Sequence, residues 1–514
     1  MKKIAAFLLL FFISISFFAQ NHYWVFFTDK NNTTFNPYEY FDQKAIERRI
    51  KNNINLYDST DFPVNQTYIQ ATINIVDSSR TVTRWFNGIS VFASEEKIKL
   101  VADLPFVKKI SPIFSHSFLA TYRTELSYSD SMLLEKSMNL HEANLFTENE
   151  IDGTGIRIAV FDGGFPGVDT IPIFEHLRKD GRILKTYDFT KNKDFVYSYN
   201  SHGTNTLSCI AGIAGNIKMG MATGAEFLLA RTEVNSEPFS EEENWLAAAE
   251  WADKNGVDII SSSLGYTLPR YFQYEMDGKS TFVAKAAKMA SDKGILVINS
   301  MGNDGDGKWK VAGTPADVEE VLSVGGVDPY SHLKINFSSL GPTADGRMKP
   351  NVCATGKAIV AGPKRIKTAY GTSFSTPIIA GFAACVMQID SSLSGQKLKK
   401  KIEESTNLYP YFDYSHGYGL PKASFFFNNK NNNNELFTVE KDNQSFKISI
   451  DTIKVDFDPE DYFYYHFRDL NGKIIKYYVL RIDKAEIYID YSYFYESFIF
   501  MAHYKGYTYE TKIN

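Results

Sequence analysis

Ser373 lies in the short polar segment Gly-Thr-Ser-Phe-Ser-Thr-Pro (371–377), directly before the mostly apolar residues 378–387. This pattern predicts a turn that leads into a buried helix. At the start of a helix, a serine oxygen lies near backbone N–H groups without intrahelical acceptors and near the positive end of the helix dipole, where developing negative charge is favoured. Ser373 is therefore a candidate nucleophile for acyl transfer, although a Ser or Thr in such a segment can also simply cap the helix.

A serine nucleophile needs a base within hydrogen-bond reach and a carboxylate that orients this base. Among the nine histidines, only His202 stands at the entry to a predicted helix after a polar loop, beside a glycine that permits close approach. Asp162 ends the apolar run 156–161 and precedes Gly-Gly, so a buried strand is predicted to deliver its carboxylate to the strand's C-terminal end. Asp162 and His202 are the candidate carboxylate and base, but each motif alone is also a common turn or helix start.

Three local sequences occur in the order Asp162, His202, Ser373: Ala-Val-Phe-Asp-Gly-Gly, Ser-His-Gly-Thr and Gly-Thr-Ser-Phe-Ser-Thr-Pro. In this order and spacing they resemble the subtilisin-like serine proteases. The resemblance implies that His202 takes the proton of Ser373, that Asp162 stabilises the imidazolium, and that water releases an acyl-enzyme. Phe374 and Ser375 depart from the Met and Ala usual in the family. His202 argues against the related family that has glutamate in its place.

Two further segments agree with the same family. Asn303, in Ser-Met-Gly-Asn-Asp-Gly, corresponds to the family's side-chain donor to the oxyanion, acting with the backbone N–H of Ser373. Ser263, Leu264 and Gly265 resemble the segment that pairs with the substrate backbone as an added strand. Without the resemblance, Asn303 would be interpreted as a turn residue and residues 263–265 as a strand end that meets a turn.

Short β-rich apolar runs alternate with helical patterns between about residues 153 and 423, the part of the chain that the resemblance covers. Such alternation predicts an α/β fold with a mainly parallel central sheet and helices on both faces, and loops at the C-terminal ends of the strands then carry the site. The predicted strands are 156–161, 226–230, 257–261, 295–299 and 321–324, and the predicted helices are 204–213, 241–255, 281–293 and 372–388.

The first 20 residues have two lysines and a short apolar run before Ala19-Gln20, which predicts a signal peptide rather than a permanent anchor. Residues 21–125 are predicted to form a propeptide and linker. A linker and a charged helix are expected within 38–50. The strand 23–27, helix 66–75, strands 81–86 and 89–93, helix 95–104 and strand 107–113 give the order of a ferredoxin-like α+β unit. Secreted subtilases carry such a propeptide, which inhibits them until it is cut. Residues 115–150 are expected to be a linker that can be cut.

The peptidase domain is predicted over 126–427 and is followed by the Asn-rich linker 428–434. Residues 435–514 form short Tyr/Phe/Ile-rich strands with a turn at Asn471-Gly472, which predicts a small β-sandwich. This domain resembles a divergent C-terminal sorting domain of type IX secretion, although the Pro-Asn-Pro and late Gly-x-Tyr patterns of such domains are not clear. A plain β accessory module is the alternative.

Composition limits the other functions. Hydrophobic residues make up 44% of the chain, charged residues 22%, and the net charge of −5 argues against a nucleic-acid partner. Cys209, Cys353 and Cys385 are too few and too widely spaced for a disulfide framework or a zinc site. No cofactor is expected. Many relatives bind structural calcium, but no Asp-rich loop here has the spacing of a calcium site.

The sequence thus predicts a serine endopeptidase that is exported as a zymogen, secreted or held at the cell surface, and active on protein or peptide substrates. The alternatives are a catalytically silent surface protein that keeps the fold for binding, and an esterase that uses the same residues. One sequence assigns neither the side-chain specificity nor the oligomeric state nor the processing sites.

Export and self-processing predict where the mature protein begins. Since the linker after the propeptide is the expected cutting site, the secreted protein should start between about residues 115 and 130. Intact-mass measurement of the secreted protein tests this, and a mature chain that still begins near residue 21 would contradict the propeptide assignment.

Overall fold

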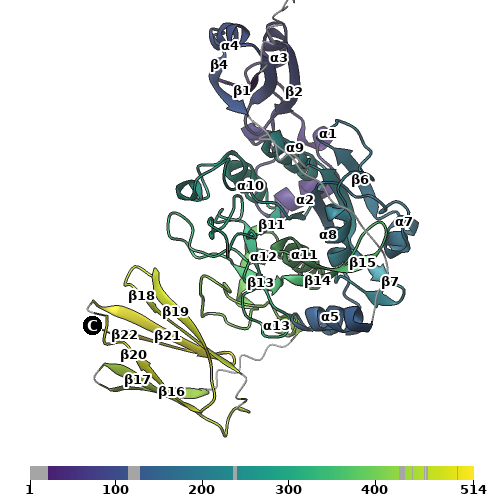
Figure 1. Ribbon diagram of the computed structural model, residues 1–514. Coiled ribbons are helices and arrows are strands. Elements are labelled where there is room, and N and C mark those ends of the chain that lie inside the picture. Colours follow the sequence, from purple (N-terminus) through teal and green to yellow (C-terminus); the bar gives the residue numbers. More distant parts are fainter. Residues whose placement is uncertain are drawn as a thin grey trace, which may run out of the picture. The chain divides into compact units, whose positions relative to one another are not determined.

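The computed structural model describes residues 21–113, 128–234, 240–427, 435–442, 444–456, 458, 461–494 and 496–513. These residues form two compact units, one from Met1–Phe35 with Ser59–Phe114 and the other from Asn36–Asp58 with Ser115–Asn514 (Figure 1). The predicted signal peptide and the Asn-rich linker lie outside the described residues. The exact domain boundaries given above stay predictions.

The first unit is a four-stranded antiparallel sheet in the order β2-β3-β1-β4, with two helices. Its elements are β1 (Asn21–Phe27), α3 (Gln66–Ile73), β2 (Ser78–Thr83), β3 (Gly88–Ala93), α4 (Glu95–Ala102) and β4 (Val107–Ile113). This is the expected ferredoxin-like order. Strand β2 starts and ends earlier than the predicted 81–86, because residues 84–87 form the turn to β3.

The second unit contains a seven-stranded sheet in the order β13-β12-β11-β10-β5-β9-β6, in which every neighbouring pair is parallel. Its strands are β5 (Arg157–Asp162), β6 (Ile183–Asp188), β9 (Glu226–Arg231), β10 (Ile259–Ser262), β11 (Leu296–Ser300), β12 (Leu322–Val327) and β13 (Val352–Thr355). The predicted α/β fold with a parallel sheet is confirmed. The two edge strands, β6 and β13, were not predicted.

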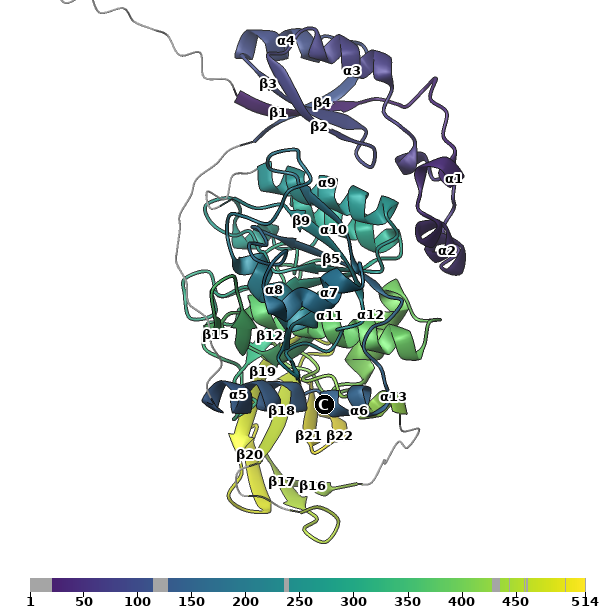
Figure 2. The same cartoon turned by 90° about the vertical axis from the view of Figure 1, so that its right-hand side faces the viewer.

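Helices cover both faces of this sheet (Figure 2). On one face lie α8 (His202–Ala211), α11 (Thr372–Ile389) and α12 (Gly395–Glu404); on the other lie α9 (Ser240–Lys254) and α10 (Phe282–Asp292). The strands supply both cores because their side chains alternate. Ile158 and Val160 of β5 join the cluster under α8 and α11, whereas Phe161 contacts Trp245 of α9 edge to face at 5.5 Å.

Helix α11 is the central core helix. It is long and apolar enough to cross a membrane, but 83% of its residues are buried inside the protein, as expected for a core helix. The cysteines Cys209, Cys353 and Cys385 are free and buried. Cys209 lies in α8 and Cys385 in α11, where both are small buried residues of the core.

Residues 128–148 are not a linker, in contrast to the prediction. They form α5 (Tyr128–Asn139) and α6 (Ala143–Glu148). Leu133 and Leu134 of α5 are buried in a cluster with Met219 and Ile359. A few apolar side chains on one face of the helix are enough to hold it, although most of its residues are polar. The remainder of the predicted linker, 114–127, lies outside the described residues.

The C-terminal part is a β-sandwich of two antiparallel sheets, β16-β17-β20 and β19-β18-β21-β22. Its strands are β16 (Phe437–Asp442), β17 (Ser445–Ile450), β18 (Tyr462–Arg468), β19 (Ile474–Arg481), β20 (Glu486–Asp490), β21 (Phe498–Tyr504) and β22 (Tyr507–Ile513). Phe446 of one sheet stacks on Phe500 of the other at 4.2 Å, so aromatic residues fill the core. The predicted sandwich is confirmed, including the turn at Asn471-Gly472 between β18 and β19.

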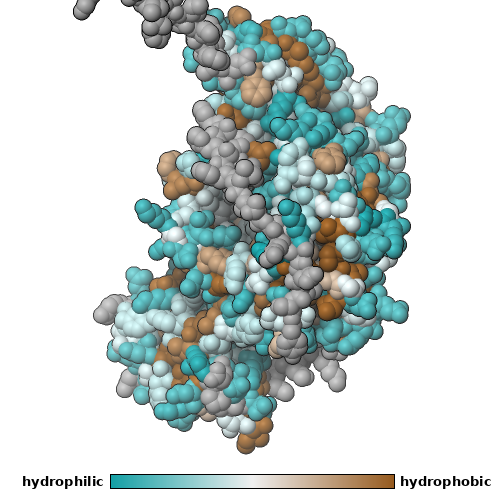
Figure 3. Space-filling model, turned by 45° about the vertical axis from the view of Figure 1, so that its right-hand side comes forward, coloured by the Kyte–Doolittle hydropathy of each residue, from teal (hydrophilic) through white to brown (hydrophobic). Residues whose placement is uncertain are grey.

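The remaining elements are short. They are α1 (Pro37–Tyr40), α2 (Gln43–Lys51), α7 (Glu175–Lys179), α13 (Ser424–Phe427), β7 (Ile213–Ala214), β8 (Ile217–Lys218), β14 (Lys357–Ala361), β15 (Ile366–Tyr370) and the 3₁₀ turns Ser59–Asp61, Pro172–Phe174 and Gln273–Glu275. The face in Figure 3 is mostly hydrophilic, with hydrophobic residues in groups that hydrophilic ones separate. Such scattered exposure is ordinary for a folded protein.

Candidate active site

The predicted site residues gather at the C-terminal ends of three neighbouring strands. Asp162 ends β5, Ser263 follows β10 and Asn303 follows β11. Since parallel neighbours end at the same edge of a sheet, these three positions share one edge. Helix α11 packs against the same strands, and Ser373 lies in its first turn. The sheet and one core helix therefore bring together residues that are 211 positions apart in the chain, from 162 to 373.

The Asp162 carboxylate is completely buried and holds His202. His202 Nδ1 lies 3.0 Å from Oδ1 and 2.9 Å from Oδ2 of Asp162. Two further donors fix the carboxylate: the Gly163 N–H donates to Oδ1 at 2.7 Å and the Thr206 hydroxyl to Oδ2 at 3.1 Å. A Cβ on Gly203 would lie 2.5 Å from the Gly164 carbonyl oxygen and 2.9 Å from Asp162 Cβ, so only glycine lets α8 approach this closely.

This arrangement decides which nitrogen of His202 carries the proton. A carboxylate only accepts hydrogen bonds, so the proton lies on Nδ1. Nε2 then has a free lone pair and can accept a proton from a hydroxyl group. The His202 side chain is 28% exposed although its carboxylate partner is buried.

Burial lowers the pKa of His202, and so does the positive charge of Lys367 on β15. The negative charge of Asp162 and the hydrogen bond to its carboxylate raise the pKa of His202. The net result is a pKa above the ordinary value of 6.5. The imidazole is thus a stronger base than a free histidine, and Asp162 stabilises the imidazolium that forms when it takes a proton.

Ser373 is the second residue of α11 and does not cap the helix. The N-cap is Gly371, whose φ of +147° strongly favours glycine. The Ser373 hydroxyl donates to the carbonyl oxygen of Ser263 at 3.3 Å, and the Ser263 hydroxyl donates back to the carbonyl oxygen of Ser373 at 2.8 Å. Pro377 explains the second bond: it stands four residues after Ser373 and lacks the N–H that would otherwise bond this carbonyl within the helix.

Asn303 lies directly beside the first turn of α11. Its Oδ1 accepts from the Thr372 backbone N–H at 2.9 Å and from the Thr372 hydroxyl at 3.0 Å. A backbone N–H can only donate, so the oxygen of the amide must face Thr372, and the Nδ2 donors face elsewhere. Nδ2 lies 3.5 Å from the Cβ position of Gly371. Thr372 therefore orients the Asn303 amide so that its N–H donors lie near Gly371, at the start of α11.

The segment 263–265 continues from β10 past these groups. The carbonyl oxygen of Leu264 accepts from Asn299 Nδ2 at 2.8 Å, which fixes the segment to the sheet, and Gly265 is exposed. Every predicted site residue therefore lies at this edge. The supporting residues Thr206, Lys367 and Thr372 were not predicted. Thr206 could have been found, since it lies four residues after His202 and thus on the same face of α8.

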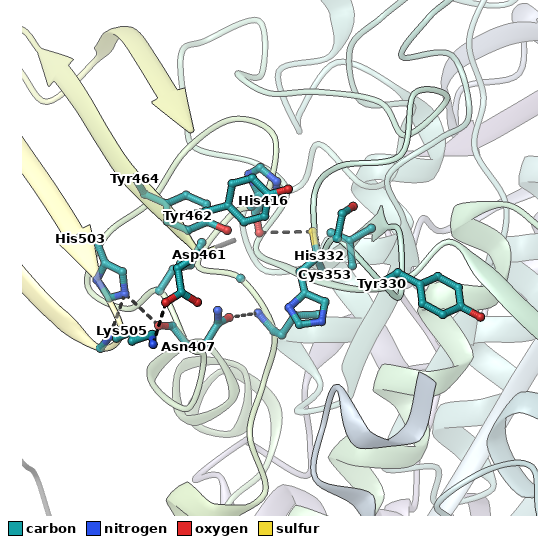
Figure 4. A pocket seen from close by; sticks show the side chains of 16 residues that line it. Tyr330, His332, Cys353, Asn407, His416, Asp461, Tyr462, Tyr464, His503 and Lys505 are labelled. Carbon is teal, nitrogen blue, oxygen red and sulfur yellow. Dashed lines mark hydrogen bonds and ion pairs between the residues drawn. The ribbon is translucent and has the colours of Figure 1, made fainter. Parts of the chain in front are cut away.

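A second Asp-His pair lies elsewhere and differs from this one. His416 Nδ1 contacts both oxygens of Asp413 at 3.1 Å, but His416 Nε2 already accepts the backbone N–H of Lys334 at 3.0 Å. His416 lines a cavity of about 520 Å³, and Cys353 lines the same cavity (Figure 4). Burial strongly raises the pKa of the Cys353 thiol. Neither the histidine nor the thiol is thus poised for catalysis.

In the described part of the chain, no three His, Cys, Asp or Glu side chains come together in a group that could hold a metal ion.

Comparison with known proteins shows the family. The sequence profile of the subtilase family matches residues 153–419, just over half of the chain. This protein belongs to the subtilase family. A second profile, the peptidase S8 propeptide domain of Bacteroidota, matches residues 22–126. The protein is thus a subtilase with a propeptide, a serine-type endopeptidase that acts on peptide bonds.

Three subtilases illustrate the similarity. The chain is 26% identical to serine protease AprX of Bacillus subtilis over 337 residues, which cover 58% of this chain and 73% of the relative. It is 28% identical to the thermophilic serine proteinase of Bacillus sp. strain AK1 over 318 residues, 60% of this chain and 70% of the relative. Subtilisin DY of Bacillus licheniformis is 26% identical over 270 residues, 52% of this chain and 89% of the relative.

Lys367 should set part of the pH dependence of this subtilase. Its positive charge lowers the pKa of His202, so Lys367→Gln should raise that pKa. A general base must be neutral to act, and the acidic limb of kcat/KM should therefore move to higher pH by a fraction of a unit. Lys364→Gln, an exposed change on the same hairpin, is the control and should leave the limb in place. A shift to lower pH in the Lys367 variant would contradict the electrostatic assignment.

Proposed function

We propose that this subtilase is a secreted endopeptidase, made as a zymogen, in which Ser373, His202 and Asp162 form the catalytic triad. The observation that carries the proposal is the 2.9 Å contact between His202 Nδ1 and the buried Asp162 carboxylate. The His202 ring also lies 5.6 Å from the ring of Phe374, the residue after Ser373 in the first turn of α11. A neutral imidazole with a free Nε2 is the base that a serine nucleophile requires.

The reaction proceeds in two steps. Ser373 Oγ attacks the carbonyl carbon of the scissile bond while its proton passes to His202 Nε2, and the imidazolium then gives this proton to the leaving amine. Water attacks the resulting acyl-enzyme by the same route, with its proton passing through His202, and releases the acid. Asp162 keeps Nδ1 protonated throughout and stabilises the positive charge.

Two donors receive the oxyanion of the tetrahedral intermediates. One is Asn303 Nδ2, because Thr372 occupies the other end of the amide. The other is the backbone N–H of Ser373, which has no intrahelical acceptor at the second position of α11. These donors are fixed before the reaction begins, so they stabilise the transition state without reorganising.

An extended substrate would pair with residues 263–265. Ser263 O now accepts the Ser373 hydroxyl at 3.3 Å. A substrate N–H that bonds to the same oxygen would compete for it and release the hydroxyl toward His202. Substrate binding would thereby help to activate the nucleophile.

The proposal of a secreted zymogen rests on two findings of different kinds. The propeptide profile covers residues 22–126, and the first 20 residues have the pattern of a signal peptide. The propeptide would inhibit the enzyme until the chain is cut. Export by type IX machinery through the C-terminal sandwich is part of the proposal and rests on local sequence alone. The proposed chemistry needs no cofactor.

Ser373→Ala tests the nucleophile, and Ser375→Ala is its matched control on the same helix. Ser375 is buried and its hydroxyl donates to the Thr355 carbonyl oxygen at 2.9 Å, away from His202. Both proteins are assayed on unfolded protein and on peptide amides after an added protease has cut the linker. The Ser373 variant should lose activity and labelling by a fluorophosphonate, while the control keeps both. A Ser373 variant that hydrolyses amides at the parent rate would sink the proposal.

Asn303→Leu should lower kcat about 100- to 1000-fold and change KM little, because the Nδ2 hydrogen bond forms only with the oxyanion. The variant also removes the acceptor of the Thr372 N–H and hydroxyl, which lie outside the substrate contact. Steady-state kinetics on a peptide substrate measure the two parameters. A raised KM with unchanged kcat would show that Asn303 only binds the ground state. Comparing amide and ester substrates in the same assays distinguishes the endopeptidase from the esterase.

A further inference from the structure

A segment of the propeptide belongs structurally to the peptidase unit. Residues 36–58, here called the clasp, lie inside the propeptide profile but form one compact unit with the peptidase part. The clasp contains α1 and α2 and connects β1 to the rest of the ferredoxin-like unit. The sequence indicated only a charged helix with two adjacent arginines here, and the proposed chemistry does not use it.

The clasp binds loops at the N-terminal ends of the sheet strands. Arg48 Nε donates to the Lys293 carbonyl oxygen at 3.1 Å, just before β11, and Arg48 also bonds to the Val257 carbonyl oxygen, just before β10. Lys51 Nζ donates to the Leu393 carbonyl oxygen at 3.1 Å. Asp162, Ser263 and Asn303 lie at the C-terminal ends of β5, β10 and β11. The clasp therefore contacts the side of the parallel sheet where its strands begin, and the candidate active site lies on the side where they end.

Charged groups dominate this contact. Arg49 forms a bidentate ion pair with Asp253 of α9, at 2.9 Å to Oδ1 and 2.8 Å to Oδ2. Arg48 donates a hydrogen bond to the same carboxylate. The side chains of all three residues are at most 3% exposed. The Phe41 ring covers the Arg49 guanidinium at 3.9 Å. Lys44 pairs with Asp258, which also accepts the Arg157 N–H at 2.8 Å.

Removing the clasp would take hydrogen-bond and ion-pair partners away from several groups of the peptidase part. The Asp253 carboxylate would lose both guanidinium partners. Lys293 Nζ, whose side chain is 2% exposed, would lose its ion pair with Asp58 at 3.0 Å, and Ser394 Oγ would lose Asn52 Oδ1 at 2.7 Å. Close, hydrogen-bonded charge pairs can couple strongly at a buried interface, so the contact should persist when the chain is cut elsewhere.

We propose that the clasp anchors the propeptide to the peptidase domain at a surface remote from the active site, so that cutting the chain within residues 114–127 leaves a two-chain complex. The peptidase domain can then lose its covalent link to the propeptide while residues 36–58 stay bound to it. The proposal needs no catalytic step, and it can fail while the proposed triad holds.

The test uses the full-length Ser373→Ala protein with a recognition site for an added protease inserted within residues 114–127. After complete cutting, the two fragments are separated by gel filtration, and the release of the N-terminal fragment is timed. It should stay with the peptidase fragment. Arg48→Met with Arg49→Met should speed release at least tenfold. Lys108→Met with Lys109→Met is the control, since it removes two adjacent positive charges from exposed positions of the propeptide, and it should release at the parent rate.

Equal release from the parent and the arginine variant would overturn the proposal, as would an equally large effect of the lysine control. If the arginine variant does not fold, Lys51→Met and Asn52→Ala provide the comparison, because each removes one contact with residues 393–394 and leaves the buried ion pairs intact. Each should speed release more than the lysine control does.

Discussion

The hydrogen bond from His202 to the buried Asp162 carboxylate is the interaction on which the candidate active site depends. It sets the tautomer of the imidazole, raises the pKa of His202 and fixes the direction of Nε2. The bond exists because β5 ends at Asp162 in the middle of a parallel sheet, and because Gly203 lets α8 begin against that strand end. The Gly163 N–H and the Thr206 hydroxyl hold the carboxylate from two other sides. A buried charge with this many donors needs no movement when the imidazolium forms.

Much of this site could be predicted because its chemistry is local in sequence. A strand followed by Asp162-Gly-Gly, and polar turns that enter helices at His202 and Ser373, each have a short signature, and the parallel sheet follows from alternating strands and helices. The pairing of Ser263 with Ser373 could not be predicted, since it joins loops far apart in the chain, although Pro377 is a local sign that the Ser373 carbonyl needs an outside donor. Edge strands β6 and β13 and helix α5 escaped prediction because tertiary packing, rather than their own sequence pattern, stabilises them.

The clasp illustrates the same limit. Two adjacent arginines in a short charged helix usually indicate a solvated surface, and nothing nearby in sequence identifies Asp253, more than 200 residues away, as their partner. The structure gives these arginines a buried role in the peptidase unit. The parallel sheet thus presents two different surfaces: its C-terminal edge carries the groups suited to acyl transfer, and its N-terminal edge holds a propeptide segment through desolvated ion pairs.

The central claim is that Ser373 is the nucleophile and that Asn303 receives the oxyanion. The most direct measurement is a crystal structure of the processed protein after reaction with a fluorophosphonate. The account predicts phosphorus bonded to Ser373 Oγ, with the phosphoryl oxygen accepting hydrogen bonds from Asn303 Nδ2 and the Ser373 backbone N–H. An adduct on another residue, or a phosphoryl oxygen directed away from Asn303, would contradict it.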